Sequence, residues 1–309
     1  MRGKEQYRED AKALRDAMEG WGTNEEKIIQ VTAFRKNNER QEIIKEYKAS
    51  FGRDAIEDLD DELGGCLCKT VLAMYLTPGA YDAQELHKAI SGLGTDDDVL
   101  IEILGTRTND QMFEIKKEYL KKYNVDLEKD VIGDTSGFYQ NLLVAILQCN
   151  RDSSHQVDHG KIMKDVKDLY DSGENKIGTD EETFIRIFSL RSAEELRSIA
   201  AEYLKATGGS LFAAIDSEFS GNVKKLLHTI LLGHTNPPEY FAQRIRDACE
   251  GLGTKDNQLI RVLVTRDEID LKEINKIYLR NYKMSLSQQI ADETSGDYKK
   301  ILLALVASD

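Results

Sequence analysis

The chain alternates apolar and polar residues with the three- and four-residue spacing of amphipathic helices. Near the start, Leu14, Ala17 and Met18 fall on one face of a predicted helix, and Ile28 and Ile29 begin the buried face of the next. Only 3 prolines occur in 309 residues, among abundant Leu, Ile, Ala, Glu and Lys. Because proline breaks helices and these other residues favour or tolerate them, the pattern predicts an all-α protein.

The apolar pattern predicts five helices in roughly the first 70 residues, a unit longer than most helical repeats. Breaks that are polar or contain glycine separate them at 20–23, 35–37, 51–52 and 63–65. The fifth predicted helix, 66–76, stops at Thr77-Pro78-Gly79, where proline and glycine are expected to end it.

A Gly-x-Gly-Thr motif follows the first predicted helix and returns three more times, the third copy having Lys in place of the first Gly. The copies are Gly20-Trp21-Gly22-Thr23, Gly92-Leu93-Gly94-Thr95, Lys176-Ile177-Gly178-Thr179 and Gly251-Leu252-Gly253-Thr254. Other residues recur at fixed distances from the second Gly of each copy. A carboxylate stands 40 residues on, as Glu62, Asp134, Glu218 and Glu293. An arginine stands 13 residues on (Arg35, Arg107, Arg191, Arg266), a tyrosine 25 residues on (Tyr47, Tyr119, Tyr203, Tyr278) and a glycine 43 residues on (Gly65, Gly137, Gly221, Gly296). Shared spacings of this kind predict a repeat array.

The spacing divides the chain into four predicted five-helix repeats. A short polar arm, 1–10, precedes repeats at 11–79, 80–150, 161–234 and 235–309, and a connector occupies 151–160. The connector is polar and without apolar periodicity, and it lengthens the distance between the second and third motifs. We therefore expect two halves joined by this connector.

The residues after each glycine motif predict the start of a helix. Thr23 with Glu26, and Thr179 with Glu182, have the spacing of a capping box, in which the threonine hydroxyl caps the helix. Thr95 with Asp98 is a weaker form of the same pattern. The glycine motif is thus expected to form a loop between two helices.

A glycine loop and a distant carboxylate together suit a hard divalent cation. Ca²⁺ takes six to eight oxygen ligands, and glycine lets consecutive carbonyls face one point. If the fold brings the residue 40 positions on beside the loop, each repeat offers three carbonyls and one carboxylate. The coordination left open suits a lipid phosphate, so that ion and lipid would each raise the affinity for the other.

Composition narrows the class of partner. A net charge of −13 and a pI near 5.0 argue against nucleic acid and against direct attraction to an anionic membrane. Four bound Ca²⁺ ions would reduce the net charge to about −5 and favour such a membrane. We expect a cytoplasmic protein that associates reversibly with membranes, because no signal peptide or transmembrane segment is evident. No Walker loop, nucleophile elbow or dinucleotide motif predicts an enzyme.

Each loop carries a large apolar residue at its tip, where a polar one would be usual. These residues are candidate membrane contacts that could insert at the headgroup boundary, or they could fold back on their own helices; they are Trp21, Leu93, Ile177 and Leu252.

These features resemble the annexin core over residues 8 to 309, and Asp134-Thr135-Ser136-Gly137 and Glu293-Thr294-Ser295-Gly296 are similar to annexin acidic loops. The resemblance implies a curved disc of four five-helix domains that binds several Ca²⁺ ions and docks on phosphatidylserine-rich membranes, with a role in membrane organisation, trafficking or repair. It implies four sets of ligands, each of three carbonyls and one carboxylate. They are Met18, Gly20, Gly22 with Glu62; Ile90, Gly92, Gly94 with Asp134; Gly173, Lys176, Gly178 with Glu218; and Cys249, Gly251, Gly253 with Glu293.

Two features depart from the annexin pattern. Annexins often carry a basic residue before the first Gly, where this chain has Glu19, Ser91 and Glu250. The arm is also too short to predict the partner-binding helix of some annexins. Alternatives to membrane docking are a helical scaffold for proteins and an ion-conducting membrane protein, and lateral self-assembly on membranes stays open. Charged residues match the family's central polar channel, and we interpret them as a buried network of paired charges: Asp82, Glu85, Glu102, Arg107, Arg261 and Asp270.

Overall fold

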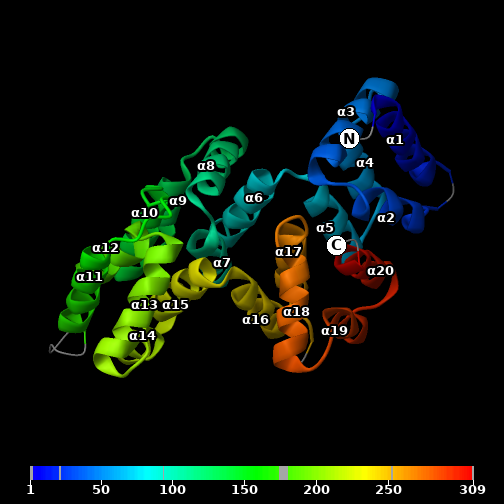
Figure 1. The fold of residues 1–309 in the computed structure, drawn as a ribbon. Helices are drawn as coiled ribbons and strands as arrows, with labels where there is room; N and C mark the ends of the chain where they lie inside the picture. Colours follow the sequence, from blue (N-terminus) through cyan, green and yellow to red (C-terminus); the bar gives the residue numbers. More distant parts are fainter. Residues whose placement is uncertain (1–2, 21, 93, 174–179, 252, 308–309) are drawn as a thin grey trace. The chain divides into compact units, whose positions relative to one another are not determined.

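The computed structural model describes residues 3–20, 22–92, 94–173, 180–251 and 253–307, and the described chain consists of helices and connecting segments without a strand (Figure 1). Repeat 1 comprises α1 (Lys4–Met18), α2 (Glu25–Ala33), α3 (Asn37–Phe51), α4 (Ala55–Glu62) and α5 (Gly65–Tyr75). Repeat 2 comprises α6 (Pro78–Ile90), α7 (Asp97–Thr106), α8 (Asn109–Tyr123), α9 (Leu127–Asp134) and α10 (Gly137–Leu147). The predicted all-α fold of five-helix repeats is confirmed.

The second half of the chain repeats the pattern after the connector. Repeat 3 comprises α11 (His159–Ser172), α12 (Glu181–Leu190), α13 (Ala193–Thr207), α14 (Leu211–Glu218) and α15 (Gly221–Thr235). Repeat 4 comprises α16 (Pro237–Cys249), α17 (Asp256–Arg266), α18 (Leu271–Tyr282), α19 (Leu286–Glu293) and α20 (Gly296–Ala307). Pro78 and Pro237 begin helices instead of ending the preceding unit, because a proline at the first helical position loses no intrahelical hydrogen bond.

The chain divides into two compact units, and they are not the predicted halves. Unit 1 combines Met1–Pro78 with Phe241–Asp309, and unit 2 is Gly79–Tyr240. The expectation of two halves joined by the connector is therefore wrong, since residues 151–158 lie inside unit 2. Repeats 1 and 4 pack together although they are the most distant in sequence.

Within each unit, the second helix of one repeat packs on the fifth helix of the other. In unit 2, α7 packs on α15 and α12 on α10; in unit 1, α2 packs on α20 and α17 on α5. The α7–α15 contact is so close that a Cβ added at Gly105 would lie 2.7 Å from Cγ2 of Thr229. Glycine is required there by the approach of the two backbones.

The arginine 13 residues after each second glycine anchors the first helix of its repeat. Arg107 donates from Nε and Nη2 to Asp82 at 2.7 and 2.9 Å, and both side chains are buried. Arg35 pairs in the same way with Asp10, and Arg191 with Asp165. Of these pairs, Arg107 with Asp82 belongs to the predicted buried network, and its bidentate hydrogen bonds join two buried charges.

Repeat 4 satisfies its arginine differently. Phe241 stands where the other repeats have aspartate, and the guanidinium of Arg266 lies 4.3 Å from the centre of its ring. Arg266 also donates to Asp270, four residues on, at 2.7 Å. In repeat 4 a cation–π contact to α16 thus replaces the ion pair with the first helix, and Asp270 provides a local ion pair.

Candidate metal site in the glycine loops

The four glycine loops are closed by the same backbone hydrogen bond. In repeats 1, 2 and 4, the amide of the residue after the motif's threonine donates across the loop to the end of the preceding helix. The pairs are Asn24 to Ala17 (2.8 Å), Asp96 to Ala89 (2.9 Å) and Lys255 to Ala248 (2.8 Å). Repeat 3 has Asp180 to Ser172 at 2.9 Å, which encloses one more residue. The described ends of the four loops are therefore joined in the same way.

The second glycine of the motif needs a left-handed backbone. Its φ is 86° at Gly22, 89° at Gly94 and 87° at Gly253, and an added Cβ would meet nothing within 4 Å at any of them. Conformation, and not lack of space, therefore selects glycine here. The open surroundings also leave this face of the loop accessible.

The fold brings the distant carboxylate to the loop in three repeats. The hydroxyl of Thr23 donates to Oε2 of Glu62 at 3.0 Å. Thr95 donates to Oδ2 of Asp134 at 2.6 Å, and Thr254 donates to Oε2 of Glu293 at 2.9 Å. Each acid is thus held beside its glycine loop by the motif's own threonine.

This contact overturns the predicted capping boxes. Asn24, one residue after Thr23, is the N-cap of α2, and its Oδ1 accepts from the amide of Lys27 at 3.0 Å. Asp96 likewise caps α7 in place of Thr95. The threonine hydroxyl is committed to the distant acid, and Thr179 lies outside the described residues.

In repeat 3, packing brings the acid to the loop. A Cβ added at Gly173 would lie 3.2 Å from Cγ of Glu218, so this carboxylate side chain lies against the start of the loop. Six predicted site residues lie outside the described ones: Lys176, Gly178 and the four loop-tip residues Trp21, Leu93, Ile177 and Leu252.

The carbonyls ahead of each loop sit at a helix C-terminus. Met18, Ile90 and Cys249 are the last residues of α1, α6 and α16, where carbonyls lack a partner within the helix. The helix dipole also places partial negative charge there, which favours a cation. Burial of Met18 and Cys249 fixes these helix ends against the core.

In repeats 1, 2 and 4, a clamp of hydrogen bonds positions the helix that carries the acid. Asp58 and Asp130 lie one turn before Glu62 and Asp134, and they accept from Tyr47 and Tyr119 at 2.6 and 2.7 Å. Gln289 accepts from Tyr278 at 2.9 Å in repeat 4. In these three repeats, the tyrosine at the shared spacing thus supports the helix that carries the acid.

The helix ahead of the loop joins the same clamp. The Arg15 guanidinium lies 3.6 Å from Asp58, His87 Nδ1 lies 3.1 Å from the Tyr119 hydroxyl, and Arg246 donates to Gln289 at 3.2 Å. Burial, with the hydrogen bond to Asp58, raises the pKa of Tyr47 to about 12. The hydrogen bond from Arg53 lowers the pKa of Asp58. Loop and acid are therefore tied to one polar cluster.

One cavity adjoins a loop and contains cations that the motif did not predict. It measures about 520 Å³ and lies beside Gly92, Gly94 and Thr95. Lys88, one turn before the loop, and Lys225 of repeat 3 line it together with Asp96, Asp97 and Asp98, and Lys225 Nζ lies 2.9 Å from Asp98. Annexins often carry a basic residue directly before the first glycine, where this chain has Ser91. Lys88 lies three residues earlier, and the turn of α6 brings it to the loop.

The oxygen atoms available at the loops, backbone carbonyls and one carboxylate, fit a hard cation. No three His, Cys, Asp or Glu side chains converge on a metal-sized site in the described parts of the chain. Any ion at a loop would therefore depend on backbone carbonyls plus one carboxylate. Carbonyl and carboxylate oxygens are the ligands that Ca²⁺ prefers, whereas zinc favours nitrogen and sulfur.

Fold and site together define a class of protein: an all-helical, four-repeat protein that brings distant carboxylates to its glycine loops. Residues 9–74, 81–146, 164–230 and 240–305 match the family model described as Annexin. The chain belongs to the annexin family, whose members bind phospholipid membranes in a Ca²⁺-dependent way. The predicted family resemblance is thus confirmed.

Individual relatives agree with this assignment. Annexin A5 of Homo sapiens is 44% identical over 302 residues, which cover 98% of this chain and 94% of that protein. Annexin A6 of Mus musculus is 45% identical over 97% of this chain, but the match spans only 45% of annexin A6. Among solved structures, annexin III superposes with a TM-score of 0.95 at 37% identity, covering 97% of this chain and 93% of that one. Calcium-bound annexin (Sm)1 superposes with a TM-score of 0.88 at 34% identity, covering 97% and 90%. Among the described helices, none combines the length and apolar character needed to cross a membrane.

Proposed function

We propose that this protein docks on anionic phospholipid membranes by sharing Ca²⁺ ions between its glycine loops and lipid phosphates. The observation that carries the proposal is the contact of Glu62, Asp134 and Glu293 with the threonines of their loops. These residues are separated by 39 positions in sequence. Such long-range contact in three repeats supports a shared site.

The proposed ligands are the carbonyl and carboxylate groups that the annexin resemblance implies. The loop carbonyls of Met18, Gly20 and Gly22 would act with Glu62 in repeat 1. The corresponding sets are Ile90, Gly92, Gly94 with Asp134; Gly173, Lys176, Gly178 with Glu218; and Cys249, Gly251, Gly253 with Glu293. In repeats 1, 2 and 4, donation by the threonine occupies part of the carboxylate's hydrogen-bonding capacity and holds its side chain at the loop.

One carboxylate neutralises only half of a divalent charge. Each loaded loop therefore presents positive charge and open coordination, which an anionic headgroup satisfies. In repeat 2, Lys88 and Lys225 offset part of the negative charge of Asp96, Asp97 and Asp98 beside the loop. We propose that Trp21, Leu93, Ile177 and Leu252 enter the headgroup boundary beside these contacts.

Co-sedimentation with phosphatidylserine vesicles tests the proposal. The natural protein should pellet with vesicles in Ca²⁺ and stay in the supernatant with a chelator. Glu62→Gln with Glu293→Gln should raise the Ca²⁺ concentration needed for half-maximal pelleting by at least about tenfold, because two charged ligands are lost. Asp61→Asn with Asp292→Asn is the matched control, since it removes the same charge from the neighbouring positions. Equal pelleting with and without Ca²⁺ would refute membrane docking through calcium.

Trp21 provides a separate test of insertion because it is the only tryptophan. Its emission should shift to the blue when Ca²⁺ and anionic vesicles are both present, and neither should suffice alone. An unchanged spectrum alongside Ca²⁺-dependent pelleting would exclude insertion at this loop and leave coordination of the headgroup intact.

A further inference from the structure

The first turn of α7 in repeat 2 is held by a helix of another repeat. Asn222 donates from Nδ2 to Oδ2 of Asp97 at 2.5 Å, and Nζ of Lys225 lies 2.9 Å from Asp98. Asp97 and Asp98 begin α7, whereas Asn222 and Lys225 belong to the start of α15 in repeat 3. Repeat 3 therefore supplies partners for two acids that follow the glycine loop of repeat 2.

This contact lies beside the loop that carries the proposed ligands of repeat 2. Only Asp96 separates Asp97 from Thr95, and the hydroxyl of Thr95 donates to Asp134 at 2.6 Å. Asp97 and Asn222 both line the cavity of about 520 Å³ that borders this loop. A shift of the first turn of α7 would therefore move Thr95 and change how it holds Asp134.

A buried tyrosine offers Asp97 a second partner. Tyr139, on α10, is 8% exposed, and burial, with Asp97 nearby, raises its pKa. The Tyr139 hydroxyl is close to this carboxylate but does not meet the geometry of a hydrogen bond with any described residue. A buried donor without an acceptor is costly, so loss of Asn222 would let Asp97 turn toward the hydroxyl.

The loop of repeat 4 has a related contact with the other repeat of its unit. Asp256 stands at the position of the aspartate just described. Burial, with Asp256 nearby, raises the pKa of the Cys66 thiol, and Lys69 donates to Oδ1 of Asn257 at 3.0 Å. Cys66 and Lys69 lie at the start of α5 in repeat 1. In each unit, the fifth helix of one repeat thus begins beside the loop of the other.

The sequence does not provide the same residues at the loops of repeats 1 and 3. Leu67 and Val223 stand at the position of Tyr139, and Glu25 and Glu181 stand at the position of the aspartate. The combination of aspartate and tyrosine therefore distinguishes the loops of repeats 2 and 4 from the other two.

We propose that Asn222 of repeat 3 is a positioning residue for the calcium site of repeat 2. By holding Asp97, it fixes the first turn of α7 and so keeps Thr95 and Asp134 in place beside the loop carbonyls. The inference rests on the calcium sites proposed above, and it adds that the site of repeat 2 is completed by a residue of another repeat.

Isothermal titration with Ca²⁺ tests the inference in the full-length protein. The binding step of repeat 2 is the one that Asp134→Asn removes. Asn222→Ala should lower the affinity of this step about tenfold and leave the other steps unchanged, since residues that orient a ligand commonly act at this scale.

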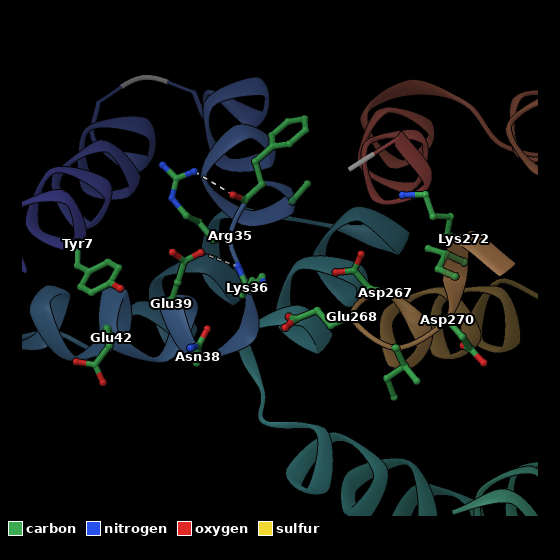
Figure 2. Close-up of a pocket in the computed structure, with 14 residues that line it drawn as sticks. Tyr7, Arg35, Lys36, Asn38, Glu39, Glu42, Asp267, Glu268, Asp270 and Lys272 are labelled. Carbon is green, nitrogen blue, oxygen red and sulfur yellow. Dashed lines mark hydrogen bonds between the residues drawn. The ribbon is translucent and has the colours of Figure 1, made fainter. Parts of the chain in front are cut away.

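Asn38→Ala is the matched control and should leave every binding step unchanged. Asn38 is likewise the second residue of its helix, α3, and it is exposed. Figure 2 shows it among the residues that line a cavity of about 1180 Å³ in unit 1, at the end of α2 away from the glycine loop.

Exchanging the two bonded side chains separates positioning from charge. Asn222→Asp places two carboxylates against each other and should weaken the step of repeat 2 at least about tenfold. An added negative charge acting by itself would instead strengthen calcium binding. Adding Asp97→Asn restores an amide–carboxylate pair with donor and acceptor exchanged, and should return the affinity to within about twofold of the natural value.

Thermal unfolding without Ca²⁺ shows whether each variant is folded and separates a structural role from positioning. A lower unfolding midpoint for Asn222→Ala with unchanged calcium affinity would assign Asn222 a structural role only and overturn the inference. Tighter calcium binding by Asn222→Asp, or no recovery in the exchanged variant, would overturn it as well. If Asp134→Asn removes no binding step, the proposed calcium site of repeat 2 itself is wrong.

Discussion

Repeats 2 and 3 each place an acid beside the described part of their loop, but they support the acid differently. In repeat 2, Asp130 lies one turn before Asp134 and is bonded by Tyr119, which His87 contacts in turn. In repeat 3, Ala214 occupies the position of Asp130 and is 2% exposed. Tyr170 takes the place of His87 and is 37% exposed. The acid of repeat 3 therefore depends on apolar packing of its helix.

The difference shows that a repeated motif does not guarantee equal sites. Ligand identity follows the shared spacing, whereas the orientation of the ligand depends on residues outside the motif. Residues that orient a ligand commonly change metal affinity by about 10- to 100-fold. We expect the sites of repeats 2 and 3 to fill at different Ca²⁺ concentrations.

Removing the acid should have the largest effect on this comparison. Asp134→Asn removes the proposed carboxylate ligand of repeat 2, and Glu218→Gln does the same in repeat 3. Each should lower the Ca²⁺ affinity of its own site about a hundredfold, since fewer charged ligands weaken calcium sites. Isothermal titration with Ca²⁺ would resolve which binding step is lost. Retention of every step in both variants would rule out these acids as ligands.

Removing the hydrogen bond that clamps the acid-bearing helix of repeat 2, so that it resembles repeat 3, should have the next largest effect. Asp130→Ala leaves Asp134 in place but frees its helix from Tyr119. We expect the Ca²⁺ affinity of this site to fall about tenfold, toward that of repeat 3. Lys129→Ala, an exposed neighbour on the same helix, serves as the control. If both variants titrate like the natural protein, the clamp does not position the acid.

Much of this site could be predicted from the sequence because the repeat spacing carries it. Four acids at one distance from four glycine loops implied contact through space, and Glu62 does lie at the loop of repeat 1. The hydrogen bond from Thr23 to Glu62 could not be predicted. The local sequence around Thr23 predicts a helix cap, whereas its actual partner lies 39 residues away. The pairing of repeats 1 and 4 was also missed, because similar apolar faces on all repeats do not specify which two pack together.

Glycine substitutions distinguish backbone strain from crowding in the two loops. Gly94→Ala forces alanine to a φ of 89° and should cost roughly 1–2 kcal/mol of stability. Gly173→Ala places a Cβ 3.2 Å from Glu218 and should weaken Ca²⁺ binding in repeat 3 by displacing that side chain. Thermal unfolding and Ca²⁺ titration report the two effects. Gly133→Ala, inside α9 with nothing within 4 Å, is the control. A loss of stability at Gly133 as large as that at Gly94 would contradict the strain argument.

The smallest effect is expected from Tyr47→Phe, which removes the hydrogen bond between Tyr47 and Asp58 in repeat 1. It should change how the free energy of unfolding depends on pH in alkaline solution. Burial raises the pKa of Tyr47 to about 12, above the value of about 10 in an unfolded chain. The neutral phenol is favoured in the folded state, so its contribution is complete below pH 10 and is lost as the pH rises toward 12. Denaturant titrations between pH 9 and 12 should show a shallower fall in the free energy of unfolding for Tyr47→Phe than for the natural protein. Tyr170→Phe, on the exposed tyrosine of repeat 3, should follow the natural curve. Identical slopes for Tyr47→Phe and the natural protein would contradict the buried hydrogen bond.

A crystal structure grown in calcium with a short-chain phosphatidylserine most directly tests whether loop and distant acid share an ion. We predict Ca²⁺ within about 2.3–2.6 Å of the carboxylates of Glu62, Asp134 and Glu293, with loop carbonyls and a lipid phosphate in the same coordination sphere. Carboxylates that keep only their threonine partners, with no ion between acid and loop at saturating calcium, would contradict the account.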